Sequence, residues 1–162
     1  MIRHWVHAAA ILTLLSLAPA AAASDPAAAK GDLPASAAAA AATVDAFHAA
    51  LRRGDTRAAA ALLADDALIF EEGRAERSRA EYEAAHLGAD AAFSKAVPGA
   101  VTRRRGAAAG DFAWIATEGL SKGKYRGAAV NRLTDETMVL RRIGQAWKIV
   151  HIHWSSAQSA VE

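Results

Sequence analysis

Hydrophobic positions follow a helical period in the first half of the chain. Val44, Phe47 and Leu51 recur at intervals of three and four residues, which predicts the apolar face of an amphipathic helix. His48 falls on the same face. Gly54 follows two arginines and suits the left-handed residue that ends such a helix.

Two more helices and one short strand are expected before the period changes. Asp55 is placed to cap a short helix over 56–63, and the apolar run over 67–70 is typical of a strand. The sequence S-R-A-E at 78–81 matches a capping box and predicts the start of a third helix. Residues 71–74 combine charges with a glycine, which fits a solvated loop or the mouth of a pocket.

After Pro98-Gly99 the hydrophobic pattern becomes that of strands. Glycine-containing turn signals at 110–111, 126–127 and 143–145 lie between or within the apolar stretches. The expected strands cover 101–106, 112–120, 124–133, 136–142 and 146–154. Helices followed by a meander of strands predict an α+β domain with the helices against one face of the sheet.

Composition narrows the class of protein. The chain has 162 residues, enough for one domain, and its 22% of charged residues excludes a disordered chain or a protein with many membrane spans. A net charge of +2 does not favour a nucleic-acid partner, and strand alternation divides the arginines at 103–105 between two faces. With 0 cysteines, disulfides, thiol nucleophiles and cysteine-ligated metals are excluded.

The first residues have the pattern of a secretory signal peptide. Arg3 precedes an apolar run over 8–18, and small residues over 20–23 form a cleavage site before Ser24. An uncleaved anchor is the alternative, but the apolar run is short for a membrane span. We therefore expect a periplasmic or secreted protein with no membrane contact after cleavage.

The rest of the chain divides into a leader, one domain and a tail. The alanines at 37–42 fit either the end of the leader or the first turns of the first helix. The expected division is a signal peptide over 1–23, a flexible leader over 24–36, a folded domain over 37–156 and a tail over 157–162.

Three stretches of the domain resemble a known family. They are LRRGDTRAAAALLADDALIF, ERSRAEYEAAHLGADAAF and ETMVLRRIGQAWKIVHIHWSS. Their order resembles the nuclear transport factor 2-like superfamily in its SnoaL-like branch. The closing W-x-I-x-H-x-H-x-S is also similar to the association domain of calcium/calmodulin-dependent kinases.

This resemblance implies a fold and a range of functions. The implied fold is a cone-shaped, curved antiparallel sheet closed by about three N-terminal helices, with a pocket inside and a homodimer formed through the sheet. The superfamily includes ketosteroid isomerases, polyketide cyclases, dehydratases, assembly domains and exported members with no assigned activity. The resemblance therefore implies the fold more narrowly than the function.

Strand alternation selects candidate pocket residues on that fold. Trp147, His151 and His153 share one face of the last strand, and Glu118 shares a strand face with apolar neighbours. We expect His151 or His153 to act as general base or acid, with Glu118 as a further catalytic candidate and Tyr82 orienting the substrate. The expected pocket is lined by Glu71, Tyr82, His86, Trp114, Glu118, Trp147, His151 and His153.

These residues also have structural interpretations. Trp114 and Trp147 fit core positions, and Glu118 fits an ion pair with a strand arginine. Tyr82 and His86, four apart on the third helix, would in this case anchor it to the sheet through hydrogen bonds. A one-residue slip in register would move the two histidines of the last strand to its other face.

Three functions remain open at this stage. The first is an exported domain that binds a small organic molecule and, if it is an enzyme, transfers protons or adds and removes water without a cofactor. The second is a non-catalytic dimerisation or assembly module. The third is a metal-binding protein that uses His151 and His153 with a third ligand from His86, Glu71 or Glu118.

Overall fold

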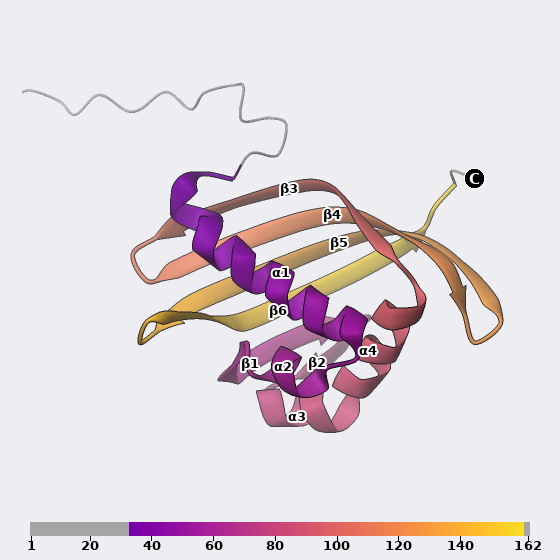
Figure 1. Cartoon of the computed structure of the whole chain (residues 1–162), viewed down its shortest axis with the longest axis horizontal. Helices are drawn as coiled ribbons and strands as arrows, with labels where there is room; N and C mark the ends of the chain where they lie inside the picture. The colour runs from indigo at the N-terminus through magenta and orange to yellow at the C-terminus, as the bar shows by residue number, and fades with distance from the viewer. Residues whose placement is uncertain (1–32, 161–162) are drawn as a thin grey trace, which may run out of the picture.

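Two helices, a short hairpin, two more helices and then four long strands follow one another in the computed structural model, which describes residues 33–160 (Figure 1). The helices are a 3-10 turn η2 (Ala35–Ala37), α1 (Ala38–Arg53), α2 (Thr56–Ala60), α3 (Arg79–Ala85) and α4 (Leu87–Ala96). The strands are β1 (Leu63–Glu71), β2 (Arg74–Glu76), β3 (Gly99–Ala109), β4 (Phe112–Tyr125), β5 (Ala128–Ile143) and β6 (Ala146–Gln158).

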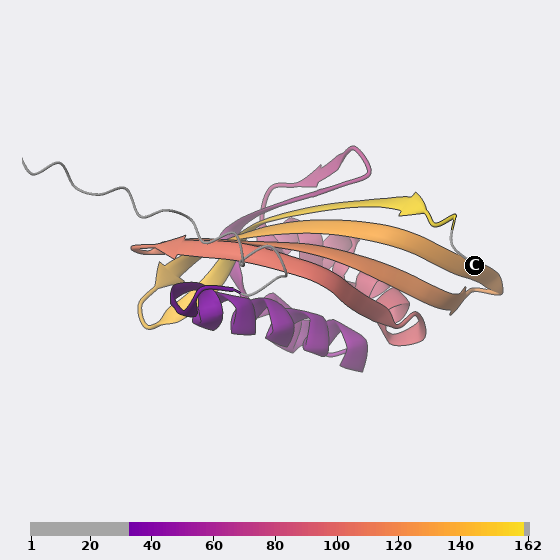
Figure 2. The ribbon, with the colours of Figure 1, turned by 90° about the horizontal axis from the view of Figure 1, so that it is seen from above.

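The six strands form one curved, unclosed sheet in the order β2-β1-β6-β5-β4-β3. Every neighbouring pair is antiparallel except β1 and β6, which run parallel. Helix α1 lies across one face, here called the inner face (Figures 1 and 2). The predicted α+β fold, a curved and mostly antiparallel sheet covered by N-terminal helices, is confirmed.

The first helices begin and end for local reasons. The alanines at 37–42 belong mostly to α1. Ala40 and Ala41 are buried on the same face as Val44, Phe47 and Leu51, so packing against the sheet stabilises the first turns of the helix. Gly54 ends α1 with a φ of 74°, as predicted. Asp55 caps α2 by accepting a hydrogen bond from the Ala58 amide at 3.0 Å.

The capping box at 78–81 is also present. The Ser78 hydroxyl accepts a hydrogen bond from the Glu81 amide at 3.1 Å, and the Glu81 carboxylate accepts one from the Arg77 amide at 2.8 Å. The helical region then breaks at His86, which caps both α3 and α4. Four α-helices therefore occupy the part of the fold where about three were expected.

The structure differs from two of the predictions. Residues 72–73 form an exposed turn, but the segment 71–74 closes a hairpin in which Glu71 pairs with Arg74. The expected strand at 124–133 is divided by the turn at Arg126-Gly127, where both φ angles are positive. Its part from residue 128 onward and the expected strand at 136–142 form one strand, β5. The chain between Ala128 and Ile143 holds no residue that interrupts pairing with β4 and β6.

The core lies between α1 and the inner face of the sheet. Ile69, Ile115, Met138 and Ile152 are neighbours across four strands, and each is at most 1% exposed. Gly106 belongs to the same face, and a Cβ there would lie 2.7 Å from Ile115 Cδ1 and 2.9 Å from a Leu33 methyl. Only glycine therefore lets the segment before η2 pack this closely onto β3.

A bulge in β6 decides which side chains face the helices. Leu140 pairs with Ile149 but Val139 pairs with His151, so Val150 is an extra residue on β6. Trp147 and Ile149 point inward before the bulge, and Ile152 and Trp154 point inward after it. His151 and His153 consequently lie on the outer face of the sheet.

The ends of the domain extend the expected bounds slightly. Strand β6 continues to Gln158, two residues into the segment expected as a tail. The signal peptide over 1–23 and most of the leader over 24–36 lie outside the described residues. None of the helices within residues 33–160 is long and apolar enough to span a membrane.

Candidate functional site

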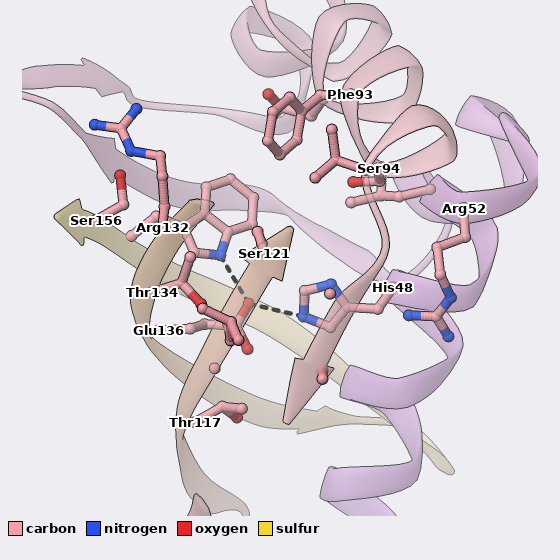
Figure 3. Close-up of a pocket in the computed structure, with 18 of the residues that line it drawn as sticks. His48, Arg52, Phe93, Ser94, Thr117, Ser121, Arg132, Thr134, Glu136 and Ser156 are labelled. Carbon is pink, nitrogen blue, oxygen red and sulfur yellow. Dashed lines mark hydrogen bonds and ion pairs between the residues drawn. The ribbon is translucent and has the colours of Figure 1, made fainter. Parts of the chain in front are cut away.

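A cavity of about 580 Å³ lies between the inner face of the sheet and the helices α1 and α4 (Figure 3). It occupies the half of the inner face that the core leaves uncovered. Asp45, His48 and Arg52 reach it from α1, and Asp90 and Phe93 reach it from α4. The floor comes from β3, β4, β5 and β6.

One row of inner-face residues crosses five strands at the floor of this cavity. Pairing places Glu71 beside Trp154, Trp154 beside Glu136, Glu136 beside Thr117, and Thr117 beside Arg104. All five residues line the cavity. The row is the first one beyond the apolar core, so it brings two carboxyl groups to the boundary between core and cavity.

Glu136 is the most unusual member of this row, because its carboxylate is only 8% exposed. Its Oε2 atom accepts hydrogen bonds from His48 Nε2 and from Trp154 Nε1, both at 2.7 Å (Figure 3). Its Oε1 atom is buried and has no hydrogen-bond partner among the described residues. A buried acceptor without a partner lowers stability, and such groups persist mainly where they have a function.

The histidine of this group has a defined orientation. An indole nitrogen is only a donor, and with Oε2 ionised the His48 Nε2 nitrogen must donate as well. In neutral His48, the other ring nitrogen, Nδ1, is then the acceptor. Glu136 therefore orients His48 in the way that carboxylates orient catalytic and metal-binding histidines in many sites.

Asp90 also lines the cavity, and with Glu71 it forms an acidic group there. The Tyr82 hydroxyl donates a hydrogen bond to Asp90 Oδ2 at 2.6 Å. Burial raises the pKa of Asp90, although the hydrogen bond from Tyr82 acts in the opposite direction. Burial, and next the charge of Asp90, raise the pKa of Tyr82 far above its usual range, so Tyr82 stays a donor.

Glu71 belongs to the same acidic group. Burial is the main cause that raises the pKa of Glu71, and the nearby Asp90 and Glu72 add to it. Glu71 lines the main cavity and an adjoining pocket of about 190 Å³. The two cavity carboxyls Glu71 and Asp90 thus take up protons more readily than exposed carboxyls do.

His86 lines the adjoining pocket but is held by its neighbours. Its Nδ1 atom contacts Glu76 Oε1, and its Nε2 atom lies 3.1 Å from Arg74 Nη1. Because arginine has no acceptor, Nε2 accepts and Nδ1 carries the proton. His86 therefore anchors the corner between α3 and α4 to β2, which is the structural role considered from the sequence.

The comparison with protein families now places the chain. The SnoaL-like domain family matches residues 40–159. This protein belongs to the SnoaL-like domain family. No curated protein matches the sequence.

Solved structures support the same assignment. A candidate ketosteroid isomerase from Shewanella frigidimarina is 33% identical, with a TM-score of 0.69, over 76% of this chain and 98% of the other. A candidate calcium/calmodulin dependent protein kinase II association domain from Xanthomonas campestris is 23% identical, with a TM-score of 0.67, over 79% and 94%. A candidate dehydratase of the nuclear transport factor 2-like family from Streptomyces avermitilis is 21% identical, with a TM-score of 0.62, over 75% and 95%.

The two structures below 25% identity show the shared fold alone. Together with the family match, they confirm the resemblance drawn from the sequence, including that to the association domains. The SnoaL-like fold of this chain and its inner cavity support a small-molecule-binding domain.

The SnoaL-like domain brings only part of the predicted site together. Glu71 lines the cavity, and His86 lines the adjoining pocket. Tyr82 does not line the cavity itself, but it donates a hydrogen bond to Asp90, which does. Trp147 is instead a core residue, 6% exposed, with the Arg142 guanidinium 4.5 Å from the centre of its ring.

The other four predicted residues lie on the outer face of the sheet, away from the cavity. His151 Nδ1 donates to the Leu68 carbonyl at 2.8 Å, and the Phe70 ring packs edge to face against both His151 and His153. The expectation of inward histidines differs from the structure because the Val150 bulge reverses the alternation of β6.

On β4 the expected inner and outer sets are exchanged. Ile115 and Thr117 face the helices, so Trp114 and Glu118 face outward. Glu118 is 57% exposed and 3.9 Å from Arg103, which is the ion pair considered from the sequence. A carboxylate in this position has no access to the cavity.

Sequence analysis did not select the pair at the centre of the cavity. The signal for His48 was a histidine on the apolar face of the first helix, and the signal for Glu136 was a glutamate in line with Met138 and Leu140 on one strand. Nothing local showed that the two would meet. Within residues 33–160, no three His, Cys, Asp or Glu side chains are grouped so that they could hold a metal ion.

Proposed function

We propose that this SnoaL-like domain binds a small organic molecule in its cavity and transfers a proton to or from it through Glu136. The observation that carries the proposal is the buried Oε1 atom of Glu136, which has no partner among the described residues. A ligand in the cavity would meet a carboxylate whose other oxygen already accepts two hydrogen bonds. Oε1 is therefore the oxygen with free capacity to accept a proton.

The chemistry that suits this group is removal of a hydrogen from a carbon next to a carbonyl. Glu136 takes the proton, and the electron pair of the C–H bond forms the double bond of an enolate. Returning the proton to another carbon isomerises the substrate. If a hydroxyl group leaves from the neighbouring carbon with a proton from Glu71 or Asp90, the same step ends in loss of water.

His48 and Trp154 position the carboxylate in this proposal. Both side chains hold Oε2, so the carboxylate cannot rotate without breaking two hydrogen bonds. Removing either donor would leave Glu136 in place but less well oriented, so turnover would fall more than ligand binding.

Exchange of carbon-bound hydrogen for deuterium tests the proposal directly. In D2O, β-tetralone and a cyclic β-hydroxyketone report proton removal and water loss by NMR. We expect the protein to accelerate at least one reaction, and Glu136→Gln to slow it by about 100-fold or more.

The matched control is Glu118→Gln, which removes an exposed carboxylate from the outer face and should leave the rate unchanged. If the protein binds both compounds but their rates stay equal to those in buffer, proton transfer is rejected, and the domain is then one that only binds its ligand. A folded Glu136→Gln variant with the wild-type rate would reject Glu136 as the base.

We also propose a homodimer formed through the outer face of the sheet. Phe112 and Trp114 on this face are 54% and 44% exposed, and Phe70 is 38% exposed, a degree of exposure that favours an interface. Binding in the cavity and assembly through the outer face use opposite sides of the sheet. Light scattering at tens of micromolar should give twice the mass of the chain, and Trp114→Glu should give the monomer mass.

Export of the domain is the third part of the proposal. It is supported by the apolar run over 8–18 and the small residues that follow it. N-terminal sequencing of protein recovered outside the cytoplasm should begin near Ser24. Recovery of a chain that begins at Met1 would reject it.

A further inference from the structure

The floor of the cavity changes its chemistry along the strands. Beyond the row of Glu136, the next inner-face row pairs Gly119 with Thr134 and Thr134 with Ser156. The row after that pairs Ser121 with Arg132. Figure 3 shows this succession from Thr117 and Glu136 to Thr134 and then to Arg132.

The polar groups of this far end are not used to hold the fold together. Ser121, Thr134 and Ser156 make no side-chain hydrogen bond within residues 33–160, and Arg132 makes neither a hydrogen bond nor an ion pair there. Inner-face positions nearer the core carry large apolar side chains instead. Three hydroxyls and a guanidinium on one stretch of sheet are therefore available to a ligand.

Most other strand arginines do have a carboxylate partner. The four pairs are Arg103 with Glu118 at 3.9 Å, Arg104 with Asp45 at 2.6 Å, Arg141 with Asp66 at 3.0 Å and Arg142 with Asp111 at 3.5 Å. Arg132 is the arginine of β5 that lines the cavity, and it is the one of its strand without such a partner among the described residues. The positive charge of Arg132 is therefore available to a ligand in the cavity.

Apart from Glu136, which is on β5 with Arg132, the acidic residues of the cavity come from other elements. Asp45 lies on α1, Asp90 on α4, and Glu71 and Glu72 at the end of β1. Arg126, at the turn between β4 and β5, is a second cationic residue at the same end as Arg132. The far end therefore has positive charge and hydroxyl donors, while the near end combines the carboxyls with Arg104, which pairs with Asp45, and with Arg52.

Between the two ends the floor of the cavity carries only small side chains. Gly119 has no side chain, and a Cβ at this position would lie 2.8 Å from the Thr134 hydroxyl. An apolar wall stands at the far end, where Phe93 and Tyr125 meet edge to face with ring centres 5.3 Å apart, and both line the cavity. Arg132 and Glu136 are four residues apart on one strand, roughly 13 Å between Cα atoms.

We propose that the natural ligand is an organic acid whose carboxylate binds Arg132 and the hydroxyls of Ser121 and Ser156, with an apolar body that extends to Glu136. This deepens the proposed function, since it rests on binding in the same cavity. Arginine and hydroxyl donors together match the two oxygens of a carboxylate, and the guanidinium can bind it in a bidentate manner. The separation of the two ends fits a head group joined to the reacting carbon through about one ring.

A pair of probes that differ only in charge tests this assignment. β-Naphthoate and β-naphthamide have the same shape, and calorimetric titration of each gives the preference for the carboxylate. We expect the wild-type protein to bind the carboxylate about 10- to 100-fold more tightly than the amide. Arg132→Gln should bring the two affinities together, and Ser121→Ala should lower the preference by a smaller factor.

Arg105→Gln is the matched control, because Arg105 is an exposed arginine of β3 that does not line the cavity. It removes the same charge and should keep the preference. A folded Arg132→Gln variant that still prefers the carboxylate would overturn the proposal and leave cavity binding intact. Failure of the wild-type protein to bind either probe in the cavity would count against both proposals, and failure of proton transfer alone would leave this one standing.

Discussion

The two halves of the inner face of this sheet differ sharply in their side chains. In one half, Ile115, Met138 and Ile152 are closed off under α1. In the other half, the next residues on the same strands and the same face are Thr117, Glu136 and Trp154, which line the cavity. A single step of two residues separates side chains that stabilise the fold from side chains that face a ligand.

This difference indicates which part of the inner face stabilises the fold and which part is available for binding. The apolar half buries large side chains with almost no exposed surface, and its one polar exception is Trp147 Nε1, which is buried without a hydrogen-bond partner among the described residues. In the polar half a carboxylate oxygen and several hydroxyls are without such partners among the described residues. Substitutions in the first half should therefore change stability, and those in the second half should change binding or its pH dependence.

The largest expected effect is in the apolar half. Trp147→Ala removes a ring that is 6% exposed, and it should lower the free energy of unfolding by about 3–5 kcal/mol. Urea denaturation followed by circular dichroism measures it. Thr134→Ala, on the cavity half of the same face, is the control and should lower it by less than about 1 kcal/mol. Equal losses for the two variants would contradict the division of the inner face.

A smaller effect is expected at the boundary between the halves. Tyr82→Phe removes the hydroxyl that donates to Asp90 at 2.6 Å, and it should lower the free energy of unfolding by about 1–2 kcal/mol. The loss of this donor should also raise the pKa of Asp90 further, since the hydrogen bond favours the ionised form. Denaturation at several pH values and carboxyl NMR titration measure the two effects. An unchanged Asp90 titration would mean that the bond contributes nothing in solution.

The smallest effect concerns Glu71 and pH. Because the pKa of Glu71 is raised in the folded state, the folded protein holds its proton more readily than the unfolded chain does. Stability from this group is present below the ordinary glutamate pKa and is lost as the pH rises through the raised value. Glu71→Gln should therefore increase stability at neutral pH relative to the wild-type protein and leave it similar in acid.

Thermal unfolding between pH 4 and pH 8 measures this dependence for Glu71→Gln, against Glu118→Gln as an exposed control. The control should follow the wild-type curve. Loss of stability at neutral pH in Glu71→Gln would show that the ionised carboxylate makes a favourable interaction, and the boundary row would then not be the destabilised part of the sheet.

Local chemistry was enough to predict the helix ends and the fold class of this protein. Gly54, Asp55 and Ser78 end or cap helices as expected, because caps depend on residues within one turn. The change from a helical to a strand period predicted the α+β class, and the order of the elements carried the resemblance to the SnoaL-like family. These features follow from interactions between residues close together in the sequence.

Only the tertiary structure decided which residues form the site. Val150 suits a strand like any other valine, so the sequence does not mark it as the extra residue that turns His151 and His153 outward. His48 and Glu136 meet because α1 packs across the sheet. Arg132 has no carboxylate partner within residues 33–160 because its neighbouring strands place Ser121 and Gln158 beside it. Alternation along a strand has a period of only two, so one inserted residue exchanges the faces, and the contacts that select a register lie far away in the sequence.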